Sequence, residues 1–158
     1  MLLIRPNNTT WLYIRHTMRI AIFHSFMDNI GGAEIVTMTL ARELQADIYT
    51  TNLDTRHIIE MGFEDVLPRI RSIGKVPIQA PFRHQLTFFR FWRLKLKNQY
   101  DFFIISGDWA MSGAVHNAPN IWYVHSPLHE LWAFVERIKK NFIPKWQVPI
   151  YELWVKFN

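Results

Sequence analysis

Apolar and polar residues follow two different patterns between residues 18 and 45. Residues 19–24 (RIAIFH) form a short apolar run, which is typical of a strand covered on both faces. Residues 25–32 contain Asp28, Asn29 and the pair Gly31-Gly32, which interrupt regular structure. Over residues 33–45, apolar side chains recur at the spacing of a helix. The stretch therefore predicts a strand, a glycine-bearing turn and a helix.

Apolar runs and helical periods, separated by proline and glycine, predict the remaining elements. We expect strands at residues 47–51, 69–75, 100–106 and 121–125, and helices near residues 56–62, 82–98, 109–116 and 128–140, with a further helix under way at residue 158. Strands that alternate with helices form parallel sheets with helices on both faces. The predicted fold class is therefore α/β, a three-layer Rossmann-like domain with a mainly parallel sheet.

We expect three regions along the chain. Residues 18–142 form the Rossmann-like domain, and residues 143–158 begin a truncated C-terminal segment. Residues 1–17 fit this pattern poorly, because two short apolar patches flank a polar stretch and leave no continuous signal-peptide core. They are either an upstream extension before a true start at Met18 or a weak interfacial anchor built on residues 11–13.

The predicted helix at residues 82–98 is both basic and aromatic. At 100° per residue, one side gathers an apolar stripe, while Phe91 and Leu94 lie away from it. The stripe consists of Phe82, Leu86, Phe89, Trp92 and Leu96. There is no acidic residue between Asp65 and Asp101. Such a helix suits an anionic membrane surface. The expected membrane or anion surface is formed by Arg83, Arg90, Arg93 and Lys97.

Composition narrows the classes of function. The chain has 158 residues, of which 49% are apolar, so it is long and apolar enough for one domain with a proper core. Its net charge of +5 indicates an anionic partner such as phosphate, nucleic acid or an acidic membrane surface. Because cysteine is absent, disulfides, thiolate zinc sites and cysteine nucleophiles are excluded. No apolar run approaches the roughly 18 to 20 residues that span a bilayer.

The glycine pair is the first candidate for chemistry. Gly31 and Gly32 stand before a predicted helix, where main-chain N–H groups and the helix dipole favour an anion such as phosphate. The pair is equally well explained by the geometry of a tight turn. The dinucleotide pattern G-x-G-x-x-G and the P-loop pattern are both absent, which disfavours NAD, FAD and NTP sites.

Polar residues at the predicted strand ends are the second group of candidates. His125 ends a strand, where it could contact a sugar hydroxyl or phosphate, transfer a proton, or be purely structural. His24 occupies a similar position and is interpreted as structural. Asp108 could cap the following helix, and Glu34 in a first helical turn is favoured by the helix dipole. The full set of crevice candidates is His24, Asp28, Ser106, Asp108 and Ser126. No spacing of ligands indicates a metal.

The chain resembles the N-terminal half of a GT-B glycosyltransferase of the retaining family 4 group. The resemblance covers about residues 18–158, and its motifs, loose singly, occur in the family's order and spacing. These motifs are MRIAIFHSF at residues 18–26, GGAE at residues 31–34, DFFIISG at residues 101–107, and IWYVHSP at residues 121–127 followed by Leu131-Trp132.

The resemblance implies two Rossmann-like domains, with a nucleotide-sugar donor held mainly by the C-terminal one. Gly31 and Gly32 match the loop that approaches the donor diphosphate, and His125 matches a strand-end histidine near the transferred sugar. The family needs no metal, so no cofactor is expected and the nucleotide sugar is a substrate. The basic aromatic helix corresponds to the region where members with lipid-linked acceptors touch the membrane. The implied location is cytoplasmic or peripheral at the inner face of the membrane.

The chain departs from the family because it lacks the C-terminal domain that carries the basic donor-binding residues and the E-x7-E signature. We therefore expect weak acceptor binding and little or no sugar transfer unless a separate donor domain is supplied. The expected partners are a nucleotide-sugar donor and a glycan or lipid-linked acceptor, without nucleic acid, because no reader motif occurs. The alternatives are a non-enzymatic module for membrane surfaces or anions, and a flavodoxin-like or other phosphate-binding Rossmann protein.

Overall fold

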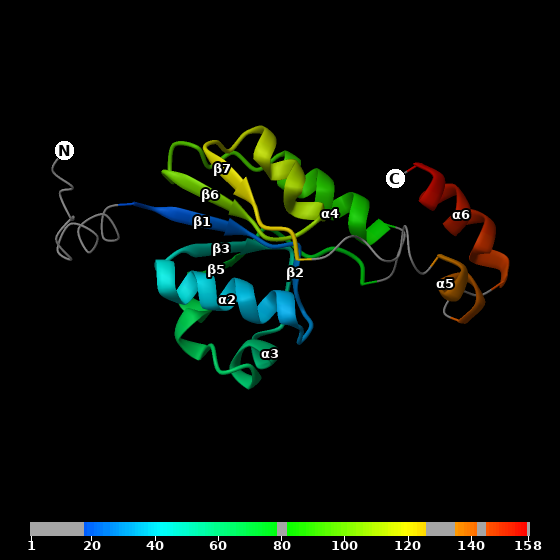
Figure 1. Cartoon of the computed structure of the whole chain (residues 1–158), viewed down its shortest axis with the longest axis horizontal. Coiled ribbons are helices and arrows are strands. Elements are labelled where there is room, and N and C mark those ends of the chain that lie inside the picture. Colours follow the sequence, from blue (N-terminus) through cyan, green and yellow to red (C-terminus); the bar gives the residue numbers. More distant parts are fainter. Residues whose placement is uncertain (1–17, 79–81, 126–134, 142–144, 158) are drawn as a thin grey trace, which may run out of the picture.

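The computed structural model describes residues 18–78, 82–125, 135–141 and 145–157 (Figure 1). The sequence-predicted extension at residues 1–17 and the crevice candidate Ser126 lie outside the described residues. So do residues 128–134 of the helix expected at residues 128–140, and Leu131-Trp132 of the glycosyltransferase resemblance.

Five parallel strands form the main sheet, in the spatial order β5-β3-β1-β6-β7. Their bounds are β1 Ile20–Phe23, β3 Asp47–Thr50, β5 Ile70–Ser72, β6 Phe102–Ile105 and β7 Asn120–Trp122. The chain builds the sheet outward from β1 on one side through β3 and β5, then returns to the other side with β6 and β7. This doubly wound order confirms the predicted α/β class with a parallel sheet.

Helices cover both faces of the sheet (Figure 1). One face carries α2 (Gly32–Leu44), α3 (Thr55–Glu60) and the 3-10 helix η1 (Glu64–Arg69). The other carries α4 (Phe82–Trp92) and the 3-10 helix η2 (Trp109–Val115). Two apolar clusters result, one around Met38 and Ile48 and one around Phe23 and Phe91. Burial on both faces explains the continuous apolar runs of the central strands.

A second, two-stranded parallel sheet extends the carboxyl ends of β1 and β3. It pairs β2 (Phe26–Met27) with β4 (Asn52–Leu53). Main-chain bonds lead into it, with the Thr51 N–H donating to the Ser25 carbonyl at 3.3 Å. This small sheet holds the start of the loop that leads to Gly31.

Helix α4 differs from its prediction in length and in orientation. It ends at Trp92 instead of residue 98, because the buried Asn117 side chain accepts from the Leu96 N–H at 2.6 Å and donates to the Leu94 carbonyl at 2.8 Å. Helix α4 buries Thr87 and Phe91, and the ring centroid of Phe91 lies 5.5 Å from that of Phe23.

The predicted apolar stripe of α4 is largely exposed. Phe82, Phe89 and Trp92 are 67%, 55% and 45% exposed, and only Leu96, beyond the helix end, is buried. The periodicity did not identify the buried face, because α4 also carries apolar residues away from the stripe and η2 packs on that other side. Gly113 of η2 allows this close packing, since a Cβ there would lie 2.7 Å from the Phe23 ring.

Strand β7 also differs from the prediction of a buried strand. It covers Asn120–Trp122 in place of residues 121–125, and all three residues are exposed. The reason is position, because β7 lies at the end of the described strand order and pairs with β6 alone. An apolar run by itself does not distinguish a central strand from an edge strand.

Two further helices, α5 (Val135–Asn141) and α6 (Val148–Phe157), follow near the C-terminus, with the 3-10 turn η3 (Lys145–Gln147) between them. Lys139 of α5 donates to Glu152 of α6 at 2.8 Å. Among the helices of the described residues, none is both long enough and apolar enough to cross a membrane.

Candidate functional site

The candidate site lies at the carboxyl ends of β1 and β6, where the strand order reverses direction. Ligands of doubly wound sheets bind in this crevice. His24 directly follows β1 and Ser106 directly follows β6, and both are buried. The Ser106 N–H donates to the Phe23 carbonyl at 2.7 Å, which keeps the two strand ends together. Sequence reasoning had placed both residues at this edge.

A chain of polar contacts connects the strand ends to helix α2. His24 Nδ1 lies 2.9 Å from the Ser106 carbonyl oxygen and 3.2 Å from Thr37 Oγ1. Thr37 Oγ1 lies 2.6 Å from Ser106 Oγ, which in turn lies 2.9 Å from His125 Nε2. The buried hydroxyls of Thr37 and Ser106 therefore stand between two histidines whose ring centroids are 6.3 Å apart.

Glu34 supplies a negative charge at one end of this chain. Its carboxylate lies 3.7 Å from His24 Nε2, and both side chains are largely buried. Burial alone raises the pKa of Glu34, but hydrogen bonding with His24 and with its own main-chain N–H outweighs this and lowers the pKa below its usual range. The carboxylate is therefore ionised at neutral pH beside the start of α2.

Asp108 and His125 have pKa values shifted in the directions that burial dictates. Burial raises the pKa of Asp108, although His125 and His24 oppose the rise. Burial and the nearby His24 lower the pKa of His125, and Ser106, Glu34 and Asp108 oppose that fall. Asp108 occupies the N-cap position of η2, as the sequence predicted, but its side chain makes no capping hydrogen bond.

The glycine turn has a geometry that the sequence did not indicate. Gly31 has extended backbone angles, φ −158° and ψ 171°, so it does not need the left-handed region that only glycine enters freely. Its lack of a side chain instead admits Glu34, since a Cβ on Gly31 would lie 2.5 Å from Glu34 Oε2. Gly32 has nothing within 4 Å of its Cβ position. The open approach to the turn is therefore over Gly32.

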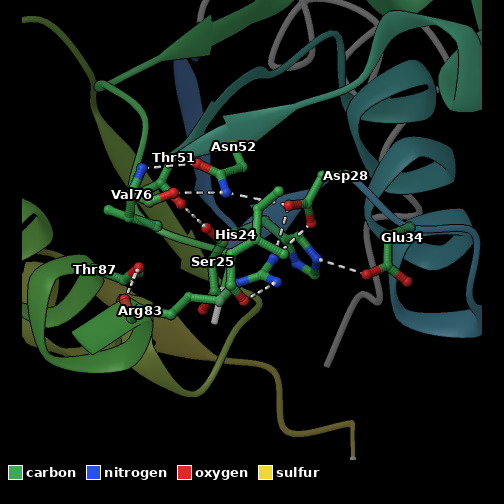
Figure 2. A network of polar contacts seen from close by, with 10 residues as sticks. His24, Ser25, Asp28, Glu34, Thr51, Asn52, Val76, Arg83 and Thr87 are labelled. Atoms are coloured by element: carbon green, nitrogen blue, oxygen red, sulfur yellow. Dashed lines mark hydrogen bonds and ion pairs between the residues drawn. The ribbon is translucent and has the colours of Figure 1, made fainter. Parts of the chain in front are cut away.

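Asp28 is held in an ion pair with α4 (Figure 2). Its two carboxylate oxygens accept from Arg83 Nη2 at 2.6 and 2.8 Å, and Asn52 Nδ2 donates to it at 3.2 Å. Arg83 also lies over the ring of Phe26, 3.9 Å from its centroid. Asn52 is fixed in turn by the main chain of Val76. Asp28 therefore anchors the loop before Gly31 to α4.

The four cations expected on one surface have different surroundings. The Arg83 side chain is only 18% exposed in its pair with Asp28, so it does not contribute to an exposed basic surface. Arg90 donates to the Ile73 and Lys75 carbonyls at 3.0 and 2.9 Å. Arg93 and Lys97 are exposed beyond the end of α4.

Sequence reasoning missed two residues of the site. Thr37 stands one helical turn after Glu34, so the i, i+3 spacing on α2 could have indicated that both face the strand ends. Ser25 is buried next to Gly107, and its hydroxyl has no hydrogen-bond partner among the described residues. The sequence signal for Ser25 was its position directly after His24 at the end of the first predicted strand.

A hollow of about 1040 Å³ lies at the opposite, amino-terminal edge of the sheet. Three arginines line it, and each is already engaged: Arg19 with Asp101, Arg42 with Asp65, and Arg69 with Gln45. None of these three arginines is therefore free to bind a ligand in the hollow. Within the described residues, no group of three or more potential metal ligands comes together.

Comparisons of the chain with protein-family models, with curated proteins and with solved structures find no match.

Proposed function

We propose that the chain is the acceptor-side domain of a retaining GT-B glycosyltransferase similar to family 4, which moves a sugar from a nucleotide-sugar donor to a glycan or lipid-linked acceptor. The observation that carries the proposal is the polar chain of His24, Thr37, Ser106 and His125 at the strand-order reversal, beside a helix that begins with glycine. The motifs at residues 18–26, 101–107 and 121–127 supply His24, Ser106 and His125, and Thr37 follows one helical turn after the motif at residues 31–34.

Each part of the site has a role in this proposal. The N–H groups at the start of α2 stabilise the charge of the leaving diphosphate, with Gly32 as the open approach. His125 contacts the transferred sugar, and the crevice orients the acceptor. The Glu34 carboxylate beside Gly31 repels an anion, so donor binding requires it to stay with His24 or to turn away.

Donor binding to the chain itself provides the test. The ¹⁵N-labelled chain is titrated with UDP-glucose, GDP-mannose and inorganic pyrophosphate, and amide shifts are followed by NMR. We expect saturable shifts at Gly31, Gly32 and residues around His125, with weak affinity because one domain supplies the contacts. Shifts confined to the hollow around Arg42 and Arg69, or no shifts with probes in the millimolar range, would contradict the proposal.

A second candidate function is a module that binds anionic membrane surfaces, and the exposed aromatic face of α4 favours it. Phe82, Phe89 and Trp92 are exposed on a helix whose following residues, Arg93 and Lys97, are exposed cations. An amphipathic helix of this composition binds a lipid interface through its apolar face and anionic headgroups through its cations.

Flotation with vesicles distinguishes this candidate from a purely soluble role. The chain is mixed with phosphatidylcholine vesicles with and without phosphatidylserine. We expect binding only with the anionic lipid, and its loss in Phe89→Ser and in a double Arg93→Gln, Lys97→Gln variant. Arg90→Gln is a poor probe because Arg90 also holds the main chain at Ile73 and Lys75. Equal flotation of all variants would reject α4 as the contact.

A further inference from the structure

The proton on His24 can be placed from the geometry of its partners. His24 Nδ1 lies 2.9 Å from the Ser106 carbonyl oxygen, and a carbonyl only accepts. Nδ1 must therefore carry a proton. The same N–H faces Thr37 Oγ1 at 3.2 Å, so the Thr37 oxygen is on the accepting side of that contact. The hydroxyl proton of Thr37 must then be donated to another atom.

The direction of hydrogen-bond donation at Thr37 determines the direction at Ser106 and at His125. Ser106 Oγ, at 2.6 Å, is the acceptor that the described residues offer to the Thr37 hydroxyl. Ser106 then donates its own proton to His125 Nε2 at 2.9 Å. A nitrogen that accepts a hydrogen bond carries no proton, and a neutral imidazole has one N–H. His125 Nδ1 is therefore the protonated nitrogen.

We infer that Thr37 and Ser106 form a one-way hydrogen-bond relay from His24 that holds His125 as its Nδ1–H tautomer, so that His125 meets a ligand as a hydrogen-bond donor. The ligand atom that fits is an acceptor oxygen of a sugar hydroxyl or phosphate. That ligand class rests on the proposed function, whereas the relay itself does not. Thr37, Ser106 and His24 are positioning residues, because they act through His125.

If the hydrogen bonds ran in the opposite direction, from His125 toward Thr37, the Thr37 hydroxyl would have no acceptor in the described part of the chain. If His125 Nε2–H donated to Ser106, the Ser106 proton would go to Thr37 Oγ1, which already faces the His24 N–H. The Thr37 hydroxyl would then lack an acceptor among the described residues. Thr37 is fully buried, and a buried hydroxyl without a partner is unfavourable.

The relay has a direct spectroscopic test in the unliganded chain. Long-range ¹H–¹⁵N correlation of the imidazole rings, at about pH 8.5 where an ordinary imidazole is neutral, identifies which nitrogen carries the proton. We expect His125 to be the Nδ1–H tautomer and His24 to carry a proton on Nδ1, with its Nε2 beside the Glu34 carboxylate. Thr37→Val keeps the shape and removes the hydroxyl, and we expect it to lower the Nδ1–H to Nε2–H ratio of His125 about fivefold, the value of one hydrogen bond.

Two control variants distinguish loss of the hydrogen-bond relay from a general structural effect of substitution in α2. Thr37→Ser restores a hydroxyl and should restore the wild-type ratio. Thr39→Val removes a hydroxyl from the same helix that donates only to the Ile35 carbonyl in the described contacts, and should leave His125 unchanged. An Nε2–H tautomer of His125 in the wild-type chain overturns the inference even if every variant fails to fold. So does an unchanged ratio in folded Thr37→Val. Neither result depends on nucleotide-sugar binding, so failure of the relay and failure of the proposed function are distinguishable.

Discussion

Gly31 and Gly32 are neighbours in sequence but have different requirements for glycine. The Cβ position of Gly31 is occupied by the Glu34 carboxylate, whereas that of Gly32 is open. Gly31 is also the N-cap of α2, a position where glycine is preferred to alanine, while Gly32 is the first helical residue. The two residues therefore form a matched pair for substitution.

We expect Gly31→Ala to destabilise the chain by about 0.5 to 1 kcal/mol, because alanine is the poorer N-cap and displaces Glu34 from His24. Gly32→Ala should stabilise it by a similar amount of about 0.5 to 1 kcal/mol, since alanine favours the helix. Urea unfolding of both variants measures the difference. Equal changes in the free energy of unfolding would show that the position of the Glu34 carboxylate does not require glycine at residue 31.

At the scale of single residues, the sequence located the site better than it explained it. His24 and Ser106 directly follow strands, as their apolar runs predicted, whereas β7 ends at Trp122, three residues before His125. The relay through Thr37 could not be predicted, since it depends on how α2 is rotated over β1. The role of Asp28 was also hidden, because its partner Arg83 is 55 residues away in sequence.

At the scale of elements, α4 and η2 are joined by an aromatic stack. The rings of His84 and Trp109 are 4.7 Å apart and inclined by only 5°. Burial, reinforced by Arg83, lowers the pKa of His84 from 6.5 to about 4. In the unfolded chain this imidazole takes up a proton more readily. The free energy of unfolding is therefore not reduced by His84 above pH 6.5, where the imidazole is neutral in both states. As the pH decreases from 6.5 toward 4, the unfolded chain binds the proton first and the free energy of unfolding falls.

We expect His84→Phe to remove this pH dependence while it keeps a ring against Trp109. The wild-type free energy of unfolding should fall by about 2 kcal/mol more than that of the variant between about pH 7.5 and pH 4.5. Urea unfolding at both pH values provides the measurement, and the variant serves as the control for all other titrating groups. Parallel losses in the two proteins would mean that His84 is not held neutral.

The Asp28–Arg83 ion pair joins the glycine loop to the first turn of α4. Both side chains are about one-fifth exposed, whereas Arg56, in its pair with Asp54, is 85% exposed. We expect Arg83→Met to destabilise the chain by about 2 kcal/mol, because it leaves the Asp28 charge largely buried without its cation. Arg56→Met should be near neutral in the same unfolding assay. If the two substitutions change the free energy of unfolding by similar amounts, the Asp28–Arg83 pair is no more important for stability than the exposed Asp54–Arg56 pair.

The helices also show where sequence patterns stop being informative. Helix α2 was predicted nearly to the residue because a single apolar face points to one sheet. Helix α4 has apolar residues on two faces, so periodicity alone could not indicate which face packs on the sheet. The contacts of this region come from a distant segment, in which Gly113 lies against Phe23 and the Phe91 main chain and Asn117 bonds to the main chain of Leu94 and Leu96.

At the scale of the whole molecule, the parallel α/β sheet was predicted from the alternation of its elements. The order of the strands was not, because apolar runs do not identify neighbours. That order is what brings residues after β1 and β6 together. The candidate site is thus a property of topology more than of any one motif.

A sugar-transfer assay tests the proposal that the chain is one domain of a two-domain glycosyltransferase. We expect the 158-residue chain alone to release nucleoside diphosphate from a nucleotide sugar far more slowly than the roughly 1 s⁻¹ of a slow typical enzyme, because the proposed donor contacts belong to a second domain. Addition of a donor-binding domain should raise the rate. Full turnover by the chain alone would contradict the need for two domains.

The central position of β1 has a consequence for folding. β1 is the first described strand to be synthesised, yet it pairs with β6, and the bond between His24 and Ser106 joins residues 82 positions apart. Contacts between such distant residues slow folding, because a long loop must close before they form. On the ribosome, β1 therefore emerges long before its partner and exposes an unpaired apolar edge meanwhile. The crevice can close only after β6 and residue 125 have followed.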